Sequence, residues 1–339
     1  MLSLLGLFLP FFALVLLGSL AVRWRWMPVE GVGGMNSFVL YFGLTALLFR
    51  AAADGGLMQP GLFNLLLSYG VAGLLVTGCG LWCAVRAGVD RRDGGLMTLG
   101  ATFPNSGFLG LPLLIGWLGE EAAGPVAATL MLDVLLASSV CLIWAHSSPG
   151  KGGGRGEGAL EGALEGVQLA ALWTAFQGAL RNPLLWALVA GLLMAAGGWS
   201  LPGPLDHAVH LLSLAATPVA LFTLGAMLAR SRIAAAARDA VPVPDVGARR
   251  RLALTLTLIK LGLHPAAVLM VGLAFRAVGA QVPDAGLLAV VMTTALPSAS
   301  NVSMLAEREG ADADLVARLT LWTTACALLT LTVWARLLG

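Results

Sequence analysis

Long apolar segments succeed one another along almost the whole of this 339-residue chain, and they limit it to very few structures. In hydrocarbon every backbone N–H and C=O needs a partner within the protein, so such a segment crosses a bilayer as an α-helix of about 20 residues. We therefore expect an all-α membrane protein embedded in a lipid bilayer. The sequence predicts ten spans, at 3–22, 36–53, 62–86, 94–117, 122–146, 182–198, 205–229, 250–279, 285–306 and 313–337.

The composition argues against several other classes of protein. Charged residues make up 11% of the chain and hydrophobic residues 58%, whereas about a quarter of the residues in a soluble domain are charged. A net charge of +2 provides no electrostatic footprint for nucleic acid. The four cysteines lie inside apolar runs and the four histidines are scattered. We therefore predict no metal site, no cofactor and no enzymatic centre.

Basic residues are distributed unevenly between the two sides of the predicted spans. Most of the 20 lysines and arginines fall in loops on one side, and only Arg50, Arg276 and Arg336 fall in loops on the other. Cytoplasmic loops carry the excess of Lys and Arg in membrane proteins. We therefore expect both termini to face outward, which requires an even number of spans.

The segment 147–181 is the one long linker, and it divides the chain into halves at 1–146 and 182–339. It is rich in Gly and repeats Glu-Gly-Ala-Leu, so a helix on the membrane surface near 159–180 and a flexible low-complexity segment are both open. Each half contains five predicted spans, and the second half therefore enters the membrane from the opposite side. This predicts two inverted five-helix repeats, the plan of many secondary transporters.

Spans four and nine, the fourth span of each half, each contain a proline near the middle, Pro104 and Pro297. A proline inside a helix removes a backbone hydrogen bond, and unwound backbone at that depth is tolerated where it lines a cavity or packs on protein. Two matched breaks followed by small polar residues predict one site between the halves, although a packed proline kink is the alternative. The candidate substrate-binding residues at the breaks are Pro104, Asn105, Ser106, Gly107, Pro297, Ser298 and Asn301.

The chemistry of these breaks favours an anion. After each proline a new half-helix begins, and its free amides and positive dipole end attract negative charge. The polar side chains around the breaks are neutral hydrogen-bonding groups. Such a site suits a carboxylate better than a metal cation.

Other polar residues also fall in or near the predicted spans. Asp133 is placed mid-span, where an acid is costly; it is a candidate for coupling transport to an ion, and a structural hydrogen bond is the equal alternative. Lys260 is a second coupling candidate, although we expect its side chain to snorkel to the inner interface. His264 is interpreted as a packing residue, and Asn36 at the start of span two either caps that helix or faces the cavity.

Several motifs resemble the auxin efflux carrier family, in order along nearly the whole chain. They are Pro104-Asn105-Ser106-Gly107-Phe108-Leu109-Gly110-Leu111-Pro112 in span four, Asn182-Pro183 opening span six, Ala216-Thr217-Pro218 in span seven, Lys260-Leu261 with His264-Pro265 in span eight, and Leu296-Pro297 with Asn301-Val302 in span nine. One departure is Thr45, which occupies a position where the family usually has proline.

The resemblance implies a ten-helix fold in which spans four and nine cross, divided into a scaffold and a moving transport domain. It implies transport of a small organic anion, such as a mono- or dicarboxylate, with substrate contacts at Pro104, Asn105 and Pro297. The short central linker is similar to that of bacterial members, including malonate and organic-acid permeases, and predicts a bacterial inner membrane. The coupling ion, proton or sodium, and a homodimeric assembly are left open.

Two other functions compete with this interpretation. A sodium/proton antiporter on a related crossover fold needs buried acids, and Asp133 is the only acid deep in a predicted span. A membrane enzyme needs a nucleophile–base pair or a metal-binding motif, neither of which is evident in the sequence. The sequence therefore favours an organic-anion permease over both alternatives.

Overall fold

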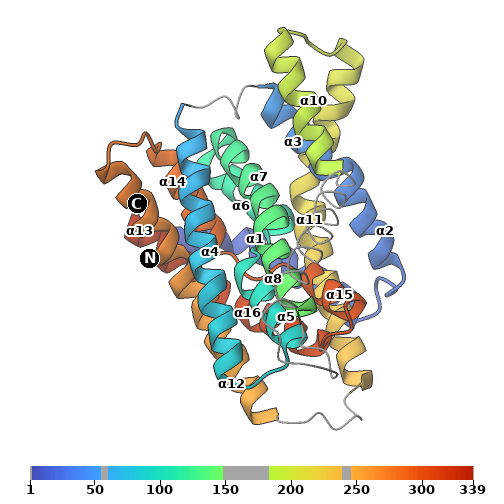
Figure 1. The fold of residues 1–339 in the computed structure, drawn as a ribbon. Coiled ribbons are helices and arrows are strands. Elements are labelled where there is room, and N and C mark those ends of the chain that lie inside the picture. The colour runs from blue at the N-terminus through green and yellow to red at the C-terminus, as the bar shows by residue number, and fades with distance from the viewer. Residues whose placement is uncertain (1, 55–59, 148–182, 239–245, 339) are drawn as a thin grey trace.

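The structure is a computed structural model that describes residues 2–54, 60–147, 183–238 and 246–338 (Figure 1). These residues form helices without a β-strand, in agreement with the all-α prediction. The predicted central linker and its surface helix near 159–180 lie outside the described residues. One isolated antiparallel β-bridge, between Pro104 and Ser298, joins two helix breaks.

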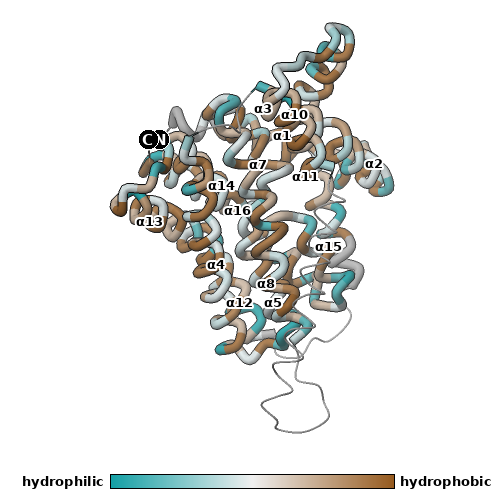
Figure 2. Tube along the Cα trace, turned by 45° about the horizontal axis from the view of Figure 1, so that its top comes forward, coloured by the Kyte–Doolittle hydropathy of each residue, from teal (hydrophilic) through white to brown (hydrophobic). Residues whose placement is uncertain are grey.

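The helices follow the predicted spans closely. Six stretches are long and apolar enough to cross a membrane, and four shorter apolar helices fall in the remaining predicted spans. In Figure 2 hydrophobic residues run along the middle of the helices, and hydrophilic residues gather toward their ends. The first half comprises α1 (Leu2–Arg23), α2 (Gly31–Phe38), α3 (Leu44–Ala53), α4 (Leu62–Arg86), α5 (Arg91–Thr102), α6 (Leu111–Leu118), α7 (Ala123–Leu132) and α8 (Ser138–His146).

The second half also has a break in its fourth span, between α14 and α15. It comprises α10 (Pro183–Gly197), α11 (Gly203–Arg238), α12 (Val246–Leu258), α13 (His264–Ala277), α14 (Asp284–Thr294), α15 (Asn301–Arg308) and α16 (Ala313–Leu338). Helix α1 begins and α16 ends on the same side of the molecule (Figures 1 and 2). This agrees with an even number of crossings.

Four spans contain a π-helical turn, in which one extra residue is inserted into the helix. These turns are η1 (Val39–Gly43), η2 (Ser106–Gly110), η4 (Asp133–Ala137) and η5 (Ile259–Leu263). The η1 turn leaves carbonyls that the Thr45 hydroxyl bonds, at 2.7 Å from Tyr41 O and 2.9 Å from Phe42 O. The Thr45 side chain therefore bonds two carbonyls of the η1 turn. Such turns occur frequently at functional sites.

The helices pack in two groups. In the first group α11 packs on α1, α2 and α3, and α10 packs on α3. Glycines allow close backbone contact there: a Cβ atom on Gly18 would collide with Phe222 O, and one on Gly225 with Val15 O. The second group contains α4, α5, α7 and α8 together with α12, α13, α14, α15 and α16. The two groups meet where α11 packs on α6 and η2, and where α1 packs on α16.

Candidate functional site

The two predicted breaks are present, and they cross each other. Helix α5 ends at Thr102 and α14 ends at Thr294, each shortly before its proline. The Asn105 N–H donates a hydrogen bond to Pro297 O at 2.9 Å, and the Ala299 N–H donates to Phe103 O at 3.0 Å. The unwound segments therefore satisfy each other's backbone groups, as buried polar backbone requires in a membrane. The prediction that the two breaks meet is confirmed.

Helix α16 supports the crossing from one side. The Ser298 N–H donates to Thr323 Oγ1 at 3.1 Å, and the Thr323 hydroxyl lies 3.3 Å from Ser298 Oγ. Thr323 and Ser298 are both fully buried. Thr323 thus supplies a side-chain acceptor for an amide that the helix break has freed, and it fixes the second unwound segment to a continuous helix.

Asn105 carries the most distinctive polar group at the crossing. Its backbone O accepts hydrogen bonds from the amides of Leu109 and Gly110, at 3.1 and 2.9 Å. Its side chain is 3% exposed, and the Nδ2 group has no hydrogen-bond partner among the described residues. A buried amide donor without a partner costs roughly 1–3 kcal/mol. Such a group is stabilised when a ligand supplies the acceptor.

Gly107 offers access to this donor. Every residue from 101 to 114 is buried except Gly107, which is partly exposed. An added Cβ atom at Gly107 would lie 3.9 Å from Leu44 Cδ1 of α3. The opening therefore lies where the η2 turn faces the first group of helices. The amides of Gly107 and Phe108 have no backbone acceptor within the described part of the chain and can serve an anion.

Behind the crossing lies a second polar cluster, formed by Tyr69, Asp133, Lys260 and His264, all of them buried. The Tyr69 hydroxyl is 2.9 and 3.0 Å from the two carboxylate oxygens of Asp133. Lys260 Nζ donates to Thr294 O at 2.8 Å and interacts electrostatically with Asp133. The ring centroids of Tyr69 and His264 are 6.4 Å apart, and both His264 ring nitrogens lack a partner among the described residues.

The prediction that Lys260 snorkels to the interface is wrong, because its side chain is fully buried. The helix break provides the physical reason. A regular helix would pair Thr294 O with the amide four residues on, but the Ser298 amide donates to Thr323 instead. Lys260 Nζ takes the vacant position, so the lysine finds a hydrogen-bond acceptor deep in the protein.

The remaining predicted residues occupy different places. Ser106 is buried at the start of η2, with its hydroxyl 3.5 Å from Pro104 O. Asn301 is exposed at the first position of α15. Asn36 is half-buried on α2, which packs on η1 and α11. Of the predicted substrate-binding residues, the structure brings together those around the two prolines, whereas Asn36 belongs to another group of helices.

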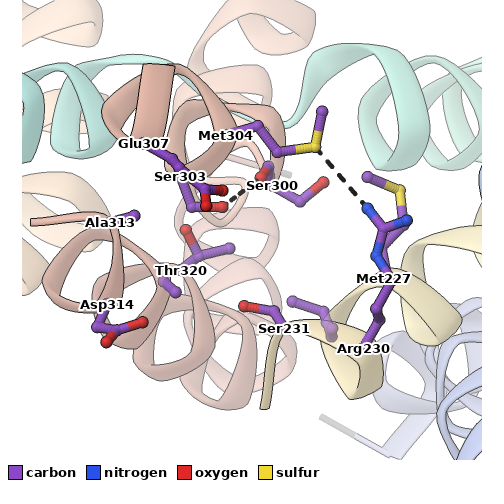
Figure 3. A pocket seen from close by; sticks show the side chains of 12 residues that line it. Met227, Arg230, Ser231, Ser300, Ser303, Met304, Glu307, Ala313, Asp314 and Thr320 are labelled. Atoms are coloured by element: carbon purple, nitrogen blue, oxygen red, sulfur yellow. Dashed lines mark hydrogen bonds between the residues drawn. The ribbon is translucent and has the colours of Figure 1, made fainter. Parts of the chain in front are cut away.

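A pocket of about 120 Å³ lies close to the second break, between α11, α15 and α16. Ser300, two residues after Ser298, is part of its wall. Figure 3 shows Arg230 of α11 on one side and Asp314 on the other, and the Arg230 guanidinium lies 3.9 Å from the Met304 sulfur. The pocket therefore lies at the boundary between the two groups of helices, and Arg230 is the basic side chain in its wall.

Sequence reasoning missed Tyr69, Thr294, Thr323 and Arg230. Threonines are common in these helices, and Thr294 acts through its backbone carbonyl, so neither threonine had a distinguishing signal. Tyr69 could have been noticed, because the chain contains only two tyrosines and this one lies in the middle of an apolar run. Among the described residues there is no group of three or more His, Cys, Asp or Glu that could hold a metal ion.

Crossed broken helices in an apolar helical protein define a class, the membrane transporters. A family model described as "Membrane transport protein" matches residues 4–153 and 168–335. The chain therefore belongs to this family, which includes the auxin efflux carriers, and it is a multi-pass membrane protein.

Three relatives are transporters by name. The chain is 29% identical over 334 residues to a "Putative malonate transporter" of Rhizobium meliloti (strain 1021), covering 96% of this chain and 93% of the relative. It is 27% identical to an uncharacterized transporter of Methanothermobacter thermautotrophicus, covering 95% and 94%. It is 23% identical to auxin efflux carrier component 8 of Arabidopsis thaliana, covering 65% and 70%.

Proposed function

We propose that this protein is a secondary active transporter that carries a small organic anion, such as a mono- or dicarboxylate, across a bacterial inner membrane. The observation that supports this most directly is the buried Asn105 amide, which lacks an acceptor among the described residues. A carboxylate oxygen would supply that acceptor. The relative named as a malonate transporter makes dicarboxylates the first substrates to test.

The ligand would approach over Gly107. The candidate donors around it are the Asn105 side chain and the amides of Gly107 and Phe108, all uncharged. Backbone amides at the start of a half-helix bind anions without the desolvation cost of a buried arginine. Ser298 faces the same crossing from the other half, with its hydroxyl held by Thr323.

The two groups of helices would move relative to each other. We assign α1, α2, α3, α10 and α11 to a scaffold and the remaining helices, with the crossing, to a transport domain; the two five-helix halves would be inverted repeats. An elevator-like movement carries the crossing past α3 and α11. The pocket between α11, α15 and α16 would be the opening on the arginine-rich, cytoplasmic side, so both termini would face outward.

The buried cluster behind the crossing is proposed to couple substrate binding to an ion, with a proton the first to test. Lys260 Nζ contacts the end of α14, and the Asp133 carboxylate is bonded by Tyr69. A change of charge at Asp133 would alter the electrostatic field at Lys260. It would thereby change the hydrogen bond from Lys260 to Thr294 O at the second break. The cluster thus connects an ionisable acid to the backbone that forms the site.

Uptake into proteoliposomes tests this function. Wild-type protein is assayed with labelled malonate and with a panel of unlabelled mono- and dicarboxylates as competitors. Asn105→Ala should reduce uptake at least about ten-fold, because a hydrogen bond to a charged acceptor contributes about 1.5–3 kcal/mol. The matched control is Asn64→Ala, since Asn64 on α4 bonds Gln281 O away from the crossing. It should transport as wild type does.

Two outcomes would contradict the proposal. One is the absence of both transport and binding for every carboxylate in the panel by folded, monodisperse protein. The other is proton or sodium exchange that proceeds without an organic anion and survives Asn105→Ala, which would favour a cation antiporter that uses Asp133.

A further inference from the structure

A second surface of the molecule carries charge that the transport site does not use. It is a groove of about 500 Å³ between the last turns of α4 and the first turns of α12. Arg86 and Trp82 line it from α4, and Arg251 and Thr255 line it from α12. Trp82, Arg86 and Arg251 are exposed, so the groove opens on the surface, and none of its lining residues belongs to the crossing. We propose that it binds the phosphate headgroup of an anionic phospholipid.

The charges of the groove are uncompensated. Its eight lining residues include two arginines and no acidic side chain. The Arg86 guanidinium lies over the Trp82 ring, 4.7 Å from its centroid, and this contact holds it at the groove without neutralising it. Neither Arg86 nor Arg251 forms an ion pair within the part of the chain that the structure describes.

Arg249, two residues before Arg251, shows the contrast. Its guanidinium is 2.8 Å from a carboxylate oxygen of Asp93 and 2.8 Å from one of Asp312. The same turn of α12 therefore carries one arginine that ties three segments of the protein together and one that faces outward into the groove. The second arginine remains available to a ligand.

Apolar side chains continue from the groove toward the middle of the membrane. Leu254 and Leu258 follow Arg251 at helical spacing on α12 and are 48% and 74% exposed. On α4, Leu75 is 61% exposed, two turns beyond Trp82. A headgroup at the arginines would place its acyl chains along these leucines. A free phosphate ion would not use them, so this continuity favours a lipid.

The groove lies on the side of the protein that the distribution of Lys and Arg among the loops predicts to be cytoplasmic, where it would face the inner leaflet. Arg86 and Arg251 belong to the loops that we assign to the cytoplasmic side, and tryptophan is enriched at membrane interfaces. Basic pockets between spanning helices on that side are typical sites for anionic headgroups. Both helices belong to the group that contains the crossing, so the bound lipid would contact the moving part of the transporter.

Lipid binding is measured on the full-length protein in neutral detergent, by native mass spectrometry and by thermal shift. Phosphatidylglycerol is titrated against phosphatidylcholine, and inorganic phosphate is a separate arm. Wild type should retain phosphatidylglycerol preferentially. Arg86→Gln and Arg251→Gln should each weaken that binding about five-fold, and together about thirty-fold, since each basic residue near an anionic surface contributes about 1 kcal/mol.

Arg250→Gln is the matched control, because Arg250 is exposed on α12 but does not line the groove. It removes the same charge and should leave phosphatidylglycerol binding within two-fold of wild type. The proposal is overturned if Arg250→Gln weakens binding as much as Arg251→Gln, if phosphatidylcholine binds equally well, or if inorganic phosphate gives the same thermal shift. If the double variant misfolds, the two single variants decide.

Discussion

Replacing Lys260 with methionine tests whether this lysine repairs the helix break. Methionine keeps the length and apolar stem of the side chain but removes the donor that lies 2.8 Å from Thr294 O. The carbonyl would then be buried and unpaired, because the Ser298 amide is already bonded to Thr323. An unsatisfied buried acceptor costs about 1–3 kcal/mol. The loss of the charge that faces Asp133 adds to that cost.

The assay is thermal unfolding of purified protein in detergent, read by intrinsic fluorescence. We expect Lys260→Met to lower the Tm by several degrees. Because Asp133 and Lys260 interact, Asp133→Asn combined with Lys260→Met should cost less than the sum of the two single changes. Arg232→Met, at an exposed arginine on α11, is the control for charge removal and should leave the Tm within about a degree.

The result that would refute this reasoning is a Tm for Lys260→Met that equals that of wild type. The carbonyl would then have another donor, and the lysine would not support the second break. Strict additivity in the double variant would separately refute the coupling between Lys260 and Asp133, while the role of the lysine at Thr294 would stand.

Two further changes test the packing of the helices, one at the crossing and one between α1 and α11. Thr323→Val removes the acceptor of the Ser298 amide and should cost about 1–3 kcal/mol of unfolding free energy and reduce uptake. Thr324→Val should be milder in the same Tm and uptake assays, because the one partner of its hydroxyl among the described residues is Thr320 O in its own helix. Gly225→Ala should greatly reduce the yield of monodisperse protein in size-exclusion chromatography, because its Cβ would collide with Val15 O; a normal yield would show that α1 and α11 can separate.

The sequence predicted the parts of the fold that depend on local signals. Apolar length located the helices, and the prolines located the breaks at residues 104 and 297. Both signals are strong. A helix needs about 20 residues to cross the hydrocarbon layer, and backbone groups freed by a proline need partners within the protein. What could not be predicted is which groups provide the compensation, since those contacts join residues that are far apart in the chain.

Lys260 shows this limit most clearly. In sequence it is a cation a few turns from a basic loop, which is typical of a snorkelling side chain. Its actual partner is a carbonyl 34 positions away, and that carbonyl is vacant only because another residue has taken the helical donor. The sequence showed that span nine breaks. It did not show which carbonyl would lose its hydrogen-bond donor or which helix would supply another.

The structure also narrows the way in which the crossing can bind an anion. From sequence, the amides after both prolines were expected to be free for the ligand. In the structure, the amides of Asn105 and Ala299 are used to join the two segments, and that of Ser298 is bonded to Thr323. On the first break the unpaired donors are the Asn105 side chain and the amides of Gly107 and Phe108, and on the second break the amides of Ser300 and Asn301 likewise have no backbone acceptor among the described residues. The crossing therefore uses its central amides to join the two halves, and it leaves the amides that open each following half-helix available to a ligand.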